Sequence, residues 1–527
     1  MNIVVEYVQN VLKGEVLEKI GIIDLGSNSV RLVLANIMPP GSAVVTGGHF
    51  VIFDEQKENI RLGQDLEKDG YIKPARITQT IKTLKMFKKL CDSYSVEKIF
   101  CVAATFLRRA KNQKSFIEEI NASTGLKFKV STEDEEAVHT YQGIINSLDI
   151  PKGVIMDISG SNMMIIQYNR RNLVNKEVIN IGTLALSSIF NDGTAEEQAM
   201  LIEAYIMDQL KRIPWLGQIE PDYQLIGVGG SFRNLAKIGR KIRKYPLDMV
   251  HNYNISQKEF DAIYKMVKTL PPGDRTKIKG LNSERADIFS VSLSTINAFM
   301  KKCGFSNIVV SGAGLRESVM FNYAVPSTMD KPISDVLMHS VYTMMSYFDI
   351  NIPHAEHVCM LSIQLYKHLR VLHKLPRMYV KPLRIAALMH DAGTRIKFYD
   401  RNRHTAYFIK NSNLYGVSHR DIILASFIAQ GTMGDDFNTV EWNKYKDLFL
   451  NPEQDLYAVR RLSIILSIAE SLDRSLSGGV KGLDCDVLGD SVIMKTITEG
   501  DCSLEIKDAM KLAPDFARAF RKNLDIL

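Results

Sequence analysis

The sequence predicts an α/β protein with a duplicated N-terminal part, followed by an all-α region and a small α+β C-terminal segment. Strand-like apolar runs alternate with amphipathic helical patterns up to about residue 325, which is typical of α/β layers. A stretch that begins at Gly21 recurs in outline from Gly153, which indicates an internal repeat. From about residue 326, long helical periodicity replaces the alternation.

The predicted elements follow these patterns in chain order. Strands are expected at 21–24, 31–37, 98–103, 153–157, 164–168, 224–228 and 307–311. Helices are expected at 335–347, 354–373 and 381–390 and onward to 473, and the segment 486–527 is expected to form a short hairpin followed by a helix. A chain of 527 residues is too long for one core. We therefore predict four parts, 16–143, 144–325, 326–483 and 484–527.

Composition excludes several classes of protein. Hydrophobic residues make up 46% and charged residues 24%, which is ordinary for folded domains. No apolar run approaches the length of a membrane span, and charges at Glu6, Lys13 and Glu15 interrupt the N-terminus. The six cysteines are scattered, without disulfide or zinc-ligand spacing. These features predict a cytoplasmic protein with no membrane partner.

The net charge of +7 is modest, but cations cluster locally. The cluster consists of Lys211, Arg212, Lys237, Arg240, Lys241, Arg243 and Lys244. A solvated helix face is the commoner origin of such a run. The alternative is a surface that guides a chain of phosphates, and no specific nucleic-acid partner is expected.

Each copy of the repeat reads as a strand, an aspartate, a turn rich in Gly, Ser and Asn, and a second strand. The first copy offers Asp24, Gly26, Ser27, Asn28 and Ser29, and the second offers Asp157, Gly160, Ser161 and Asn162. Such turns tolerate positive φ and present backbone N–H groups and short side-chain donors to phosphate oxygens. One turn of this kind is commonly only a turn. Two copies with matched aspartates favour a clamp around phosphate.

Two further glycine turns follow predicted strands and open helical patterns. One contains Gly229, Gly230 and Ser231, and the other, 311–317, contains Arg316. An anion at such a turn meets free N–H groups and the positive end of a helix dipole. We therefore count these residues among the candidate phosphate ligands.

These motifs resemble the exopolyphosphatase and guanosine-pentaphosphate phosphohydrolase (Ppx/GppA) family of the sugar kinase, Hsp70 and actin-like superfamily. The resemblance runs from about Gly21 to Asp473 and rests on the segments DLGSNS from Asp24, ATFLRRAKN from Ala104, TGLKFKVSTEDEEA and SGAGLRE from Ser311. It implies two actin-like (ribonuclease H-like) domains, and it suggests a homodimer. It also implies that Glu136 is the catalytic base and that Arg108 holds phosphate.

Hydrolysis of a terminal phosphoanhydride requires an oriented water, a carboxylate and compensating cations. Asp24 and Asp157 are suited to bind Mg²⁺ or another divalent cation together with phosphate oxygens. The sequence departs from the family where Asp-Ile-Gly-Gly-Gly-Ser-Thr-Glu is usual, because Met164 replaces the second carboxylate. Val138 also replaces the arginine that usually follows Glu-Glu-Ala.

The helical region resembles an HD domain, a metal phosphohydrolase arrangement ordered His, His-Asp, Asp. The matching residues are His357, His390, Asp391 and Glu470. Because Glu470 replaces an aspartate and further ligands are not obvious, a structural relic is favoured over an active metal site.

The sequence thus predicts a Mg²⁺-dependent phosphoanhydride hydrolase, an exopolyphosphatase that processively removes the terminal phosphate of inorganic polyphosphate. The first alternative is a guanosine pentaphosphate (pppGpp) 5′-phosphohydrolase, since both substrates present the same terminal anhydride, and stacking aromatics near Phe232 or Tyr245 would distinguish it. The second is a binding regulator without turnover, which Met164 favours. The Glu136 segment and the HD-like tail argue against a sugar or acetate kinase.

Overall fold

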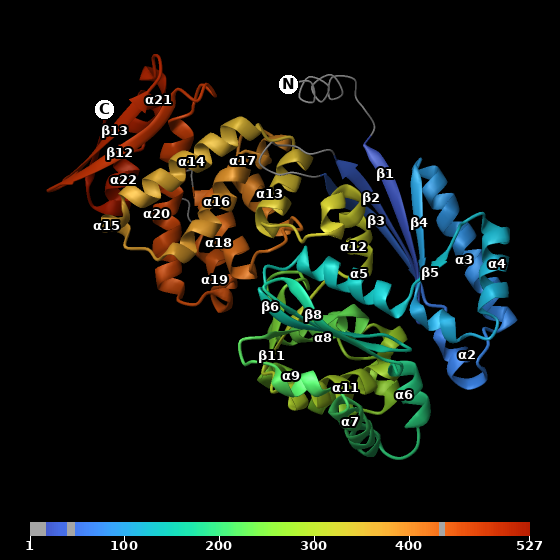
Figure 1. The fold of residues 1–527 in the computed structure, drawn as a ribbon. Helices are drawn as coiled ribbons and strands as arrows, with labels where there is room; N and C mark the ends of the chain where they lie inside the picture. The colour runs from blue at the N-terminus through green and yellow to red at the C-terminus, as the bar shows by residue number, and fades with distance from the viewer. Residues whose placement is uncertain (1–16, 39–47, 432–437) are drawn as a thin grey trace. The chain divides into compact units, whose positions relative to one another are not determined.

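The computed structural model describes residues 17–38, 48–431 and 438–527 (Figure 1). These residues form two compact units, one of residues 17–38 and 48–334 and one of residues 335–431 and 438–527. None of the helices within the described ranges is long and apolar enough to cross a membrane.

The first unit contains two sheets. The first sheet has the order β3-β2-β1-β4-β5. Its strands are β1 (Glu18–Leu25), β2 (Val30–Met38), β3 (His49–Glu58), β4 (Lys98–Ala103) and β5 (Lys129–Val130). The first three strands form an antiparallel meander, and β4 and β5 continue in parallel from β1. The middle of β1, the central strand of this sheet, is buried without alternation, as expected for a strand covered on both faces.

The second sheet repeats this topology and adds one edge strand. Its order is β10-β11-β9-β6-β7-β8. Its strands are β6 (Lys152–Ile158), β7 (Met163–Asn169), β8 (Asn172–Ile179), β9 (Gln224–Val228), β10 (Tyr253–Ser256) and β11 (Asn307–Val310). Strands β6 to β8 form the meander, and β9 and β11 follow in parallel. The predicted duplication is therefore confirmed, with Asp24 opposite Arg31 in one copy and Asp157 opposite Met164 in the other.

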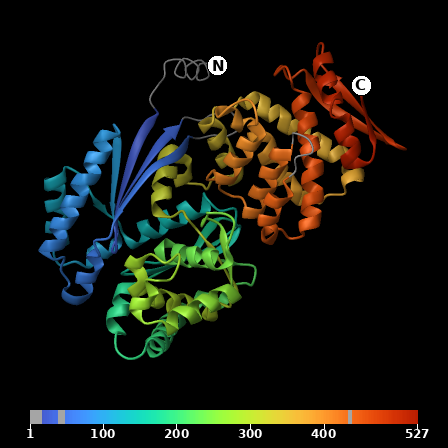
Figure 2. The same cartoon turned by 180° about the vertical axis from the view of Figure 1, so that it is seen from behind.

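Helices of the first unit flank and separate the two sheets (Figure 2). They are α2 (Leu62–Asp69), α3 (Pro74–Ser93), α4 (Gln113–Thr124), α5 (Glu133–Ile145), α6 (Thr183–Ile189), α7 (Ala195–Lys211), α8 (Gly229–Arg243), α9 (Gln257–Thr269), α10 (Pro272–Arg275), α11 (Ala286–Cys303) and α12 (Leu315–Ala324). Short 3₁₀ turns at Thr105–Arg109, Pro214–Gln218, Ser283–Arg285 and Pro326–Met329 connect them. Each sheet has its own apolar core.

Helices α5 and α12 cross in the middle of the first unit. Thr132 caps the start of α5 with a capping box, in which its side chain accepts from the N–H of Glu135 and the Glu135 carboxylate accepts from the N–H of Thr132. The helices approach closely at Gly143, where a Cβ atom would lie 2.1 Å from the carbonyl oxygen of Gly314. This contact joins the C-terminal part of α5 to the start of α12, so it fixes the two helices that carry Glu136 and Arg316 relative to one another.

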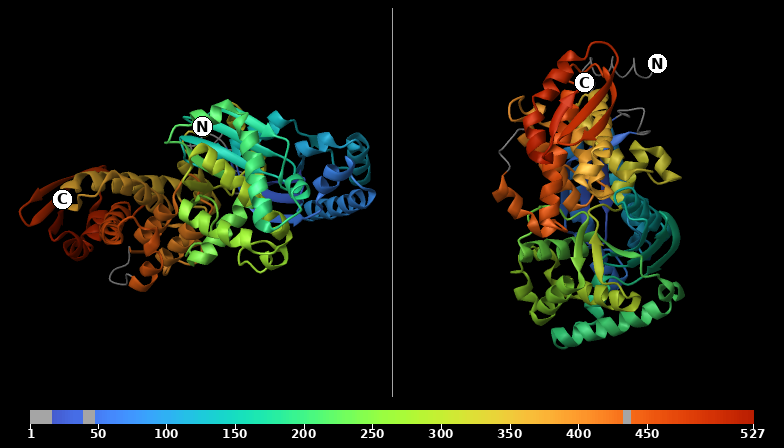
Figure 3. Two further views of the ribbon diagram at one scale, coloured as in Figure 1. Left: turned by 90° about the horizontal axis from the view of Figure 1, so that it is seen from below. Right: turned by 90° about the vertical axis from the view of Figure 1, so that its left-hand side faces the viewer.

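The second unit is a helical bundle with a small sheet. Its helices are α13 (Val336–Tyr347), α14 (Ile352–His368), α15 (Arg370–His373), α16 (Val380–Met389), α17 (Arg401–Asn411), α18 (His419–Gln430), α19 (Thr439–Lys444), α20 (Pro452–Ser471), α21 (Ser503–Met510) and α22 (Ala513–Phe520). Short 3₁₀ turns lie at Arg377–Tyr379, Ala392–Arg395 and Lys446–Leu448. The strands β12 (Val480–Leu488), β13 (Ser491–Thr498) and β14 (Asn523–Ile526) form this sheet, in which β12 lies beside α14 (Figure 3).

The predicted fold class is confirmed, since two similar α/β sheets precede a helical region and a small sheet. The C-terminal segment is richer than predicted. Its hairpin begins at Val480, two helices follow it, and β14 returns to pair in parallel with β13. The exact boundaries predicted at residues 143, 325 and 483 stay predictions.

Candidate active site

The predicted phosphate turns surround one cavity of about 150 Å³ in the first unit. Both sheets contribute to it, together with the N-terminal ends of α5, α8 and α12. The predicted residues that line it are Asp24, Gly26, Ser27, Asn28, Ser29, Glu136, Asp157, Gly160, Asn162, Gly229, Gly230 and Arg316. Residues more than a hundred positions apart in the sequence therefore converge on one small volume.

The two repeated turns have the same internal geometry. The N–H of Gly26 donates to the carbonyl of Ser29 at 3.1 Å, and the N–H of Ser159 donates to the carbonyl of Asn162 at 2.9 Å. They also approach one another, because a Cβ atom on Gly160 would lie 2.9 Å from Ser27 Oγ. The side-chain amide of Asn28 is buried and neither of its polar atoms has a partner among the described residues. A polar ligand in the cavity would satisfy it.

Asp24 and Asp157 present two carboxylates to the cavity. Burial raises the pKa of both, although Arg31 and Arg233 oppose this rise. Two enclosed carboxylates beside phosphate-type turns are a donor set that fits Mg²⁺, which prefers one or two carboxylates plus phosphate oxygens. Gly229 supports this arrangement, because its φ is +86° and an added Cβ atom would lie 2.5 Å from Asp157 Oδ1.

Glu136 lies in the first turns of α5 with its carboxylate held at the cavity wall. The backbone N–H of Thr105 donates to Glu136 Oε2 at 2.9 Å, and the Thr105 hydroxyl donates to the same oxygen. Burial raises the pKa of Glu136, and these two hydrogen bonds only partly offset that rise. A fixed carboxylate of raised pKa is suited to accept a proton from water.

Four arginines line the same cavity, namely Arg31, Arg233, Arg285 and Arg316. Burial and the neighbouring Arg233 lower the pKa of Arg31 to about 10. Burial and Arg31 likewise lower the pKa of Arg285 to about 10. Arg316 donates to Glu55 at 2.6 Å, whereas Arg233 and Arg285 make no ion pair with any described residue. The cavity therefore concentrates positive charge that an anionic ligand would compensate.

Of these four arginines, the sequence motifs predicted only Arg316 as a phosphate ligand. Arg31 and Arg233 each follow a predicted phosphate turn by two residues, so their spacing offered a weak signal. Arg285 carries no local signal, because it lies on a 3₁₀ turn far from any glycine motif. The tertiary structure brings its guanidinium against Gly230, where a Cβ atom would lie 2.3 Å from the guanidinium carbon.

Three predicted residues lie outside the cavity lining. Ser231 Oγ bonds to Ser292 Oγ at 2.9 Å within the core. The carbonyl of Ser161 accepts from Arg109 at 3.3 Å. Arg108 donates to the backbone carbonyls of Ser131 at 2.8 Å and Val130 at 3.1 Å, so it joins the turn that carries Thr105 to the segment that precedes α5.

The two arginines of the basic run at the end of α8 contact neighbouring carboxylates. Arg240 pairs with Asp248, and Arg243 lies 3.4 Å from Glu259. At the C-terminal end of α7, Arg212 pairs with Asp208 at 2.8 Å. These contacts favour the solvated helix face over a phosphate-guiding surface for the three arginines.

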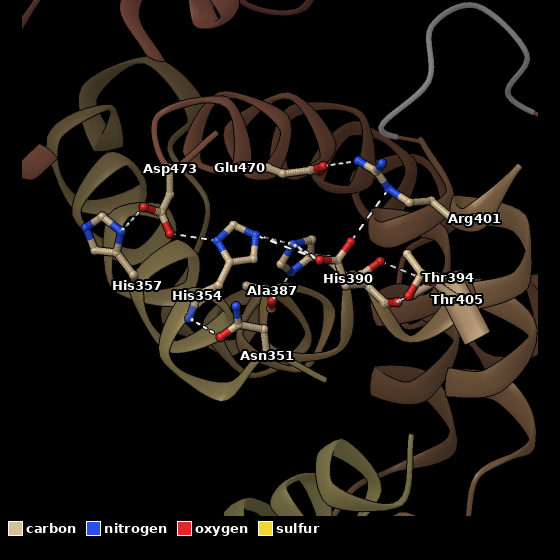
Figure 4. A network of polar contacts seen from close by, with 11 residues as sticks. Asn351, His354, His357, Ala387, His390, Thr394, Arg401, Thr405, Glu470 and Asp473 are labelled. Atoms are coloured by element: carbon tan, nitrogen blue, oxygen red, sulfur yellow. Dashed lines mark hydrogen bonds and ion pairs between the residues drawn. The ribbon is translucent and has the colours of Figure 1, made fainter. Parts of the chain in front are cut away.

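The HD-like residues lie in the second unit and come together only in part (Figure 4). His390 and Asp391 form a cluster with His354. His357 lies outside this cluster, because its Nε2 bonds to the carbonyl of Val480 at 2.8 Å and its Nδ1 lies 3.0 Å from Asp473. Glu470 is also outside it and pairs with Arg401.

The sequence is similar to known phosphatase families and to individual proteins. The model of the Ppx/GppA phosphatase family matches residues 43–325, and the model of Ppx/GppA phosphatase domain III matches residues 336–495. A bifunctional 3-dehydroquinate synthase/phosphatase of Fusobacterium nucleatum is 26% identical over 300 residues, which are 55% of this chain but only 44% of that protein. A guanosine-5′-triphosphate,3′-diphosphate pyrophosphatase of Aeromonas salmonicida is 23% identical over 403 residues, 75% of this chain and 76% of that protein.

Solved structures share the fold. The Aquifex aeolicus member of the Ppx/GppA family has 24% sequence identity and a TM-score of 0.51, covering 59% of this chain and 99% of that chain. An exopolyphosphatase from Cytophaga hutchinsonii has 23% identity and a TM-score of 0.53, covering 58% of this chain and 98% of that chain. With the two family models together covering most of the sequence, the chain belongs to the Ppx/GppA phosphatase family.

Proposed function

We propose that this protein is an exopolyphosphatase, which hydrolyses the terminal phosphoanhydride of inorganic polyphosphate. The observation that carries the proposal is the cavity itself. It combines two facing phosphate-type turns, four arginines and the fixed carboxylate of Glu136 in about 150 Å³. This set supplies what phosphoryl transfer requires, namely positioning, compensation of charge and a group that orients water.

The reaction follows from the roles of these residues. Arg31, Arg233 and Arg285 bind the oxygens of the terminal phosphoryl group and offset their charge. Glu136 orients a water molecule and accepts its proton as the new bond from oxygen to phosphorus forms. The bridging oxygen then leaves with the polyphosphate chain, which is one phosphate shorter. Arg108 acts indirectly, since it fixes the turn on which Thr105 holds Glu136.

Members of this family generally depend on divalent metals. Asp24 and Asp157 would hold Mg²⁺ or a similar cation, which when bound would compensate further negative charge on the phosphate oxygens. The protein residues still perform the binding and the proton transfer described above.

The choice of polyphosphate over guanosine pentaphosphate rests on what faces the cavity. Phe232 is fully buried in the core of the second sheet, and Tyr245 packs edge-on against Tyr253 with ring centroids 4.9 Å apart. Among the described residues that line the cavity, Phe106 is the only aromatic one. A guanine base would therefore lack the predicted stacking partners, whereas a chain of phosphates needs none. Guanosine pentaphosphate stays the second candidate, because it is the guanosine-5′-triphosphate,3′-diphosphate in the name of the Aeromonas relative.

A regulator without turnover is less well supported. Met164 is buried in an apolar cluster with Ala137 and Ile155 and is not part of the cavity lining. The loss of a carboxylate at this position leaves Asp24, Asp157 and Glu136 at the cavity, which are sufficient for the proposed chemistry. The predicted cytoplasmic location and homodimer stay predictions.

The test is phosphate release by the purified full-length protein with Mg²⁺, measured with long-chain polyphosphate and with guanosine pentaphosphate at equal concentrations of termini. The proposal expects a kcat/KM for polyphosphate at least about 10-fold above that for the nucleotide, since one lost favourable contact is worth about this much. A preference for guanosine pentaphosphate would establish the second candidate. Tight binding of either compound without release would indicate a regulator.

A further inference from the structure

The second unit contains a cluster of potential metal ligands that the proposed phosphatase chemistry does not use. His354 lies in the first turn of α14, His390 caps the C-terminal end of α16, and Asp391 follows directly. Figure 4 shows the imidazole of His354 between Asp473 on one side and His390 on the other. Both imidazoles are buried, with 6% and 5% of their surface exposed, so the cluster is part of the bundle interior.

We propose that His354, His390 and Asp391 bind a divalent transition-metal ion. Their three facing atoms converge, with His354 Nε2 3.2 Å from His390 Nε2 and with Asp391 Oδ2 3.8 Å and 3.6 Å from these two nitrogens. Ligands bound to one ion at about 2.0–2.2 Å lie roughly 3.0–3.6 Å apart in tetrahedral or octahedral geometry. The observed separations need only small side-chain adjustments to enclose an ion.

The hydrogen bonds on the far side of each ring fix which nitrogen faces the cluster. His354 Nδ1 donates to Asp473 Oδ2 at 2.6 Å, and His390 Nδ1 donates to the carbonyl of Ala387 at 2.7 Å. A carbonyl and an ionised carboxylate can only accept, so both Nδ1 atoms carry hydrogen. In the neutral rings, both Nε2 atoms then direct lone pairs at each other and at the Asp391 carboxylate. This arrangement of three acceptors is unfavourable without a cation between them.

These outer contacts are also the ones that orient histidine ligands at metal sites, where the second ring nitrogen commonly donates to a carboxylate or a backbone carbonyl. Asp473 is itself fixed, because its Oδ1 accepts from the N–H of Gly478 at 2.9 Å and lies 3.0 Å from His357 Nδ1. On the other side, Thr405 Oγ1 donates to the backbone carbonyl of His390 at 2.8 Å. The cluster is therefore held in position before any ion binds.

The ligand types indicate the kind of ion. Two imidazoles and one carboxylate suit Zn²⁺, Co²⁺, Fe²⁺ or Mn²⁺, whereas Mg²⁺ prefers oxygen ligands. Three protein ligands leave at least one position open on a tetrahedral ion, and Asp391 retains 27% side-chain exposure through which solvent can reach it. Arg401 Nε lies 3.6 Å from Asp391 Oδ1 and pairs with Glu470, so Glu470 compensates Arg401 and is not a ligand.

The experiment uses the full-length protein after treatment with EDTA and then with excess Mg²⁺, which occupies oxygen-rich sites such as that of Asp24 and Asp157. Co²⁺ is titrated and followed by its visible absorption, and bound Zn²⁺ is counted by elemental analysis. The proposal expects an absorption band that saturates at one ion per chain. The variants His390→Gln and Asp391→Asn should weaken Co²⁺ affinity at least about 100-fold, since each removes a direct ligand.

Two further variants separate ligands from neighbours. His368 lies on α14, as His354 does, but pairs with Asp484, so His368→Gln should bind Co²⁺ as the wild type does. His357→Gln should keep one ion per chain with affinity about 10-fold weaker, because His357 contacts the ligand His354 only indirectly, through Asp473. Because Asp391 is partly exposed and asparagine is nearly isosteric, Asp391→Asn tests the proposal even if His390→Gln fails to fold. The proposal would be overturned if the wild type showed no saturable Co²⁺ binding, or if Asp391→Asn bound Co²⁺ as tightly as the wild type. A proton shared between the two imidazoles would then account for their approach.

Discussion

Thr105 holds the carboxylate of Glu136 through two hydrogen bonds to one oxygen. The backbone N–H donates at 2.9 Å and the hydroxyl donates to the same Oε2, which leaves Oε1 for a proton or a water molecule. Thr105 stands on the turn that follows β4 in the first sheet, and Glu136 on the helix that crosses to α12. These two hydrogen bonds therefore fix the Glu136 carboxylate to the turn that follows β4.

Thr105→Val should lower kcat about 10-fold and leave KM for polyphosphate nearly unchanged, since a hydrogen bond to a charged group is worth about 1.5–3 kcal/mol. The backbone bond remains, so the loss should be partial. Thr105→Ser, which keeps the hydroxyl, should restore most of the activity. Steady-state phosphate release from the three proteins measures this, and an equal loss in the serine variant would refute the positioning role.

The pH dependence of kcat follows from the raised pKa of Glu136. A protonated carboxyl cannot accept a proton, so kcat should fall as the pH drops through that pKa, and the acid limb should lie above the ordinary value of 4.5. The hydroxyl of Thr105 lowers this pKa, so Thr105→Val should shift the limb to higher pH. A limb at or below the ordinary value, or one that does not move in the variant, would contradict the assignment of Glu136 as base.

The arginines make a separate prediction about binding. Arg285→Gln should raise KM for polyphosphate about 10-fold or more, because it removes a charged donor that has no ion-pair partner among the described residues. The matched control is Arg212→Gln, whose arginine pairs with Asp208 on the exposed face of α7.

Arg108→Gln should instead lower kcat, since Arg108 contacts the backbone of Ser131 and Val130. A rise in KM alone for Arg108→Gln would restore the clamp role predicted from the sequence.

Gly229 tests the geometry of the aspartate site. Alanine there meets two obstacles, because φ is +86° and its Cβ atom would lie 2.5 Å from Asp157 Oδ1. Gly229→Ala should lower the melting temperature and raise the Mg²⁺ concentration needed for half-maximal activity. A left-handed alanine alone costs about 1–2 kcal/mol. Gly217→Ala, where a Cβ atom would have nothing within 4 Å, is the control and should behave as the wild type in both measurements.

The sequence revealed the strands whose residues are apolar and central. The runs at Lys98–Ala103 and Gln224–Val228 form strands with the predicted bounds. It did not reveal β3 and β8, which end their meanders at the sheet edge and carry charged, partly exposed residues. Edge strands lack the second neighbour that would demand a continuous apolar run, so periodicity is weak there.

The same limit applies to the sites. The turn residues were predictable because glycine-rich turns repeat in sequence, but Arg285 reaches the cavity only through tertiary packing. In the second unit, the sequence pointed to His357 and Glu470, whereas His354 belongs to the cluster and Asp473 holds His354 from outside it. His354 and His357 lie three positions apart in the sequence, as do Glu470 and Asp473. Residues at this spacing lie on the same side of a helix, so periodicity does not decide which member of each pair meets His390.

Glu136→Gln and Glu135→Gln together test whether Glu136 is the catalytic base. Both are neighbouring glutamates on α5, but Glu135 pairs with Lys129 at 2.7 Å and caps the helix, away from the cavity. With Mg²⁺ and long-chain polyphosphate, Glu136→Gln should lower kcat by about 10²–10⁴, the usual contribution of a general base, while polyphosphate still binds. Glu135→Gln should retain nearly full kcat. Comparable turnover in the two variants would contradict the claim that Glu136 is the base of this phosphatase.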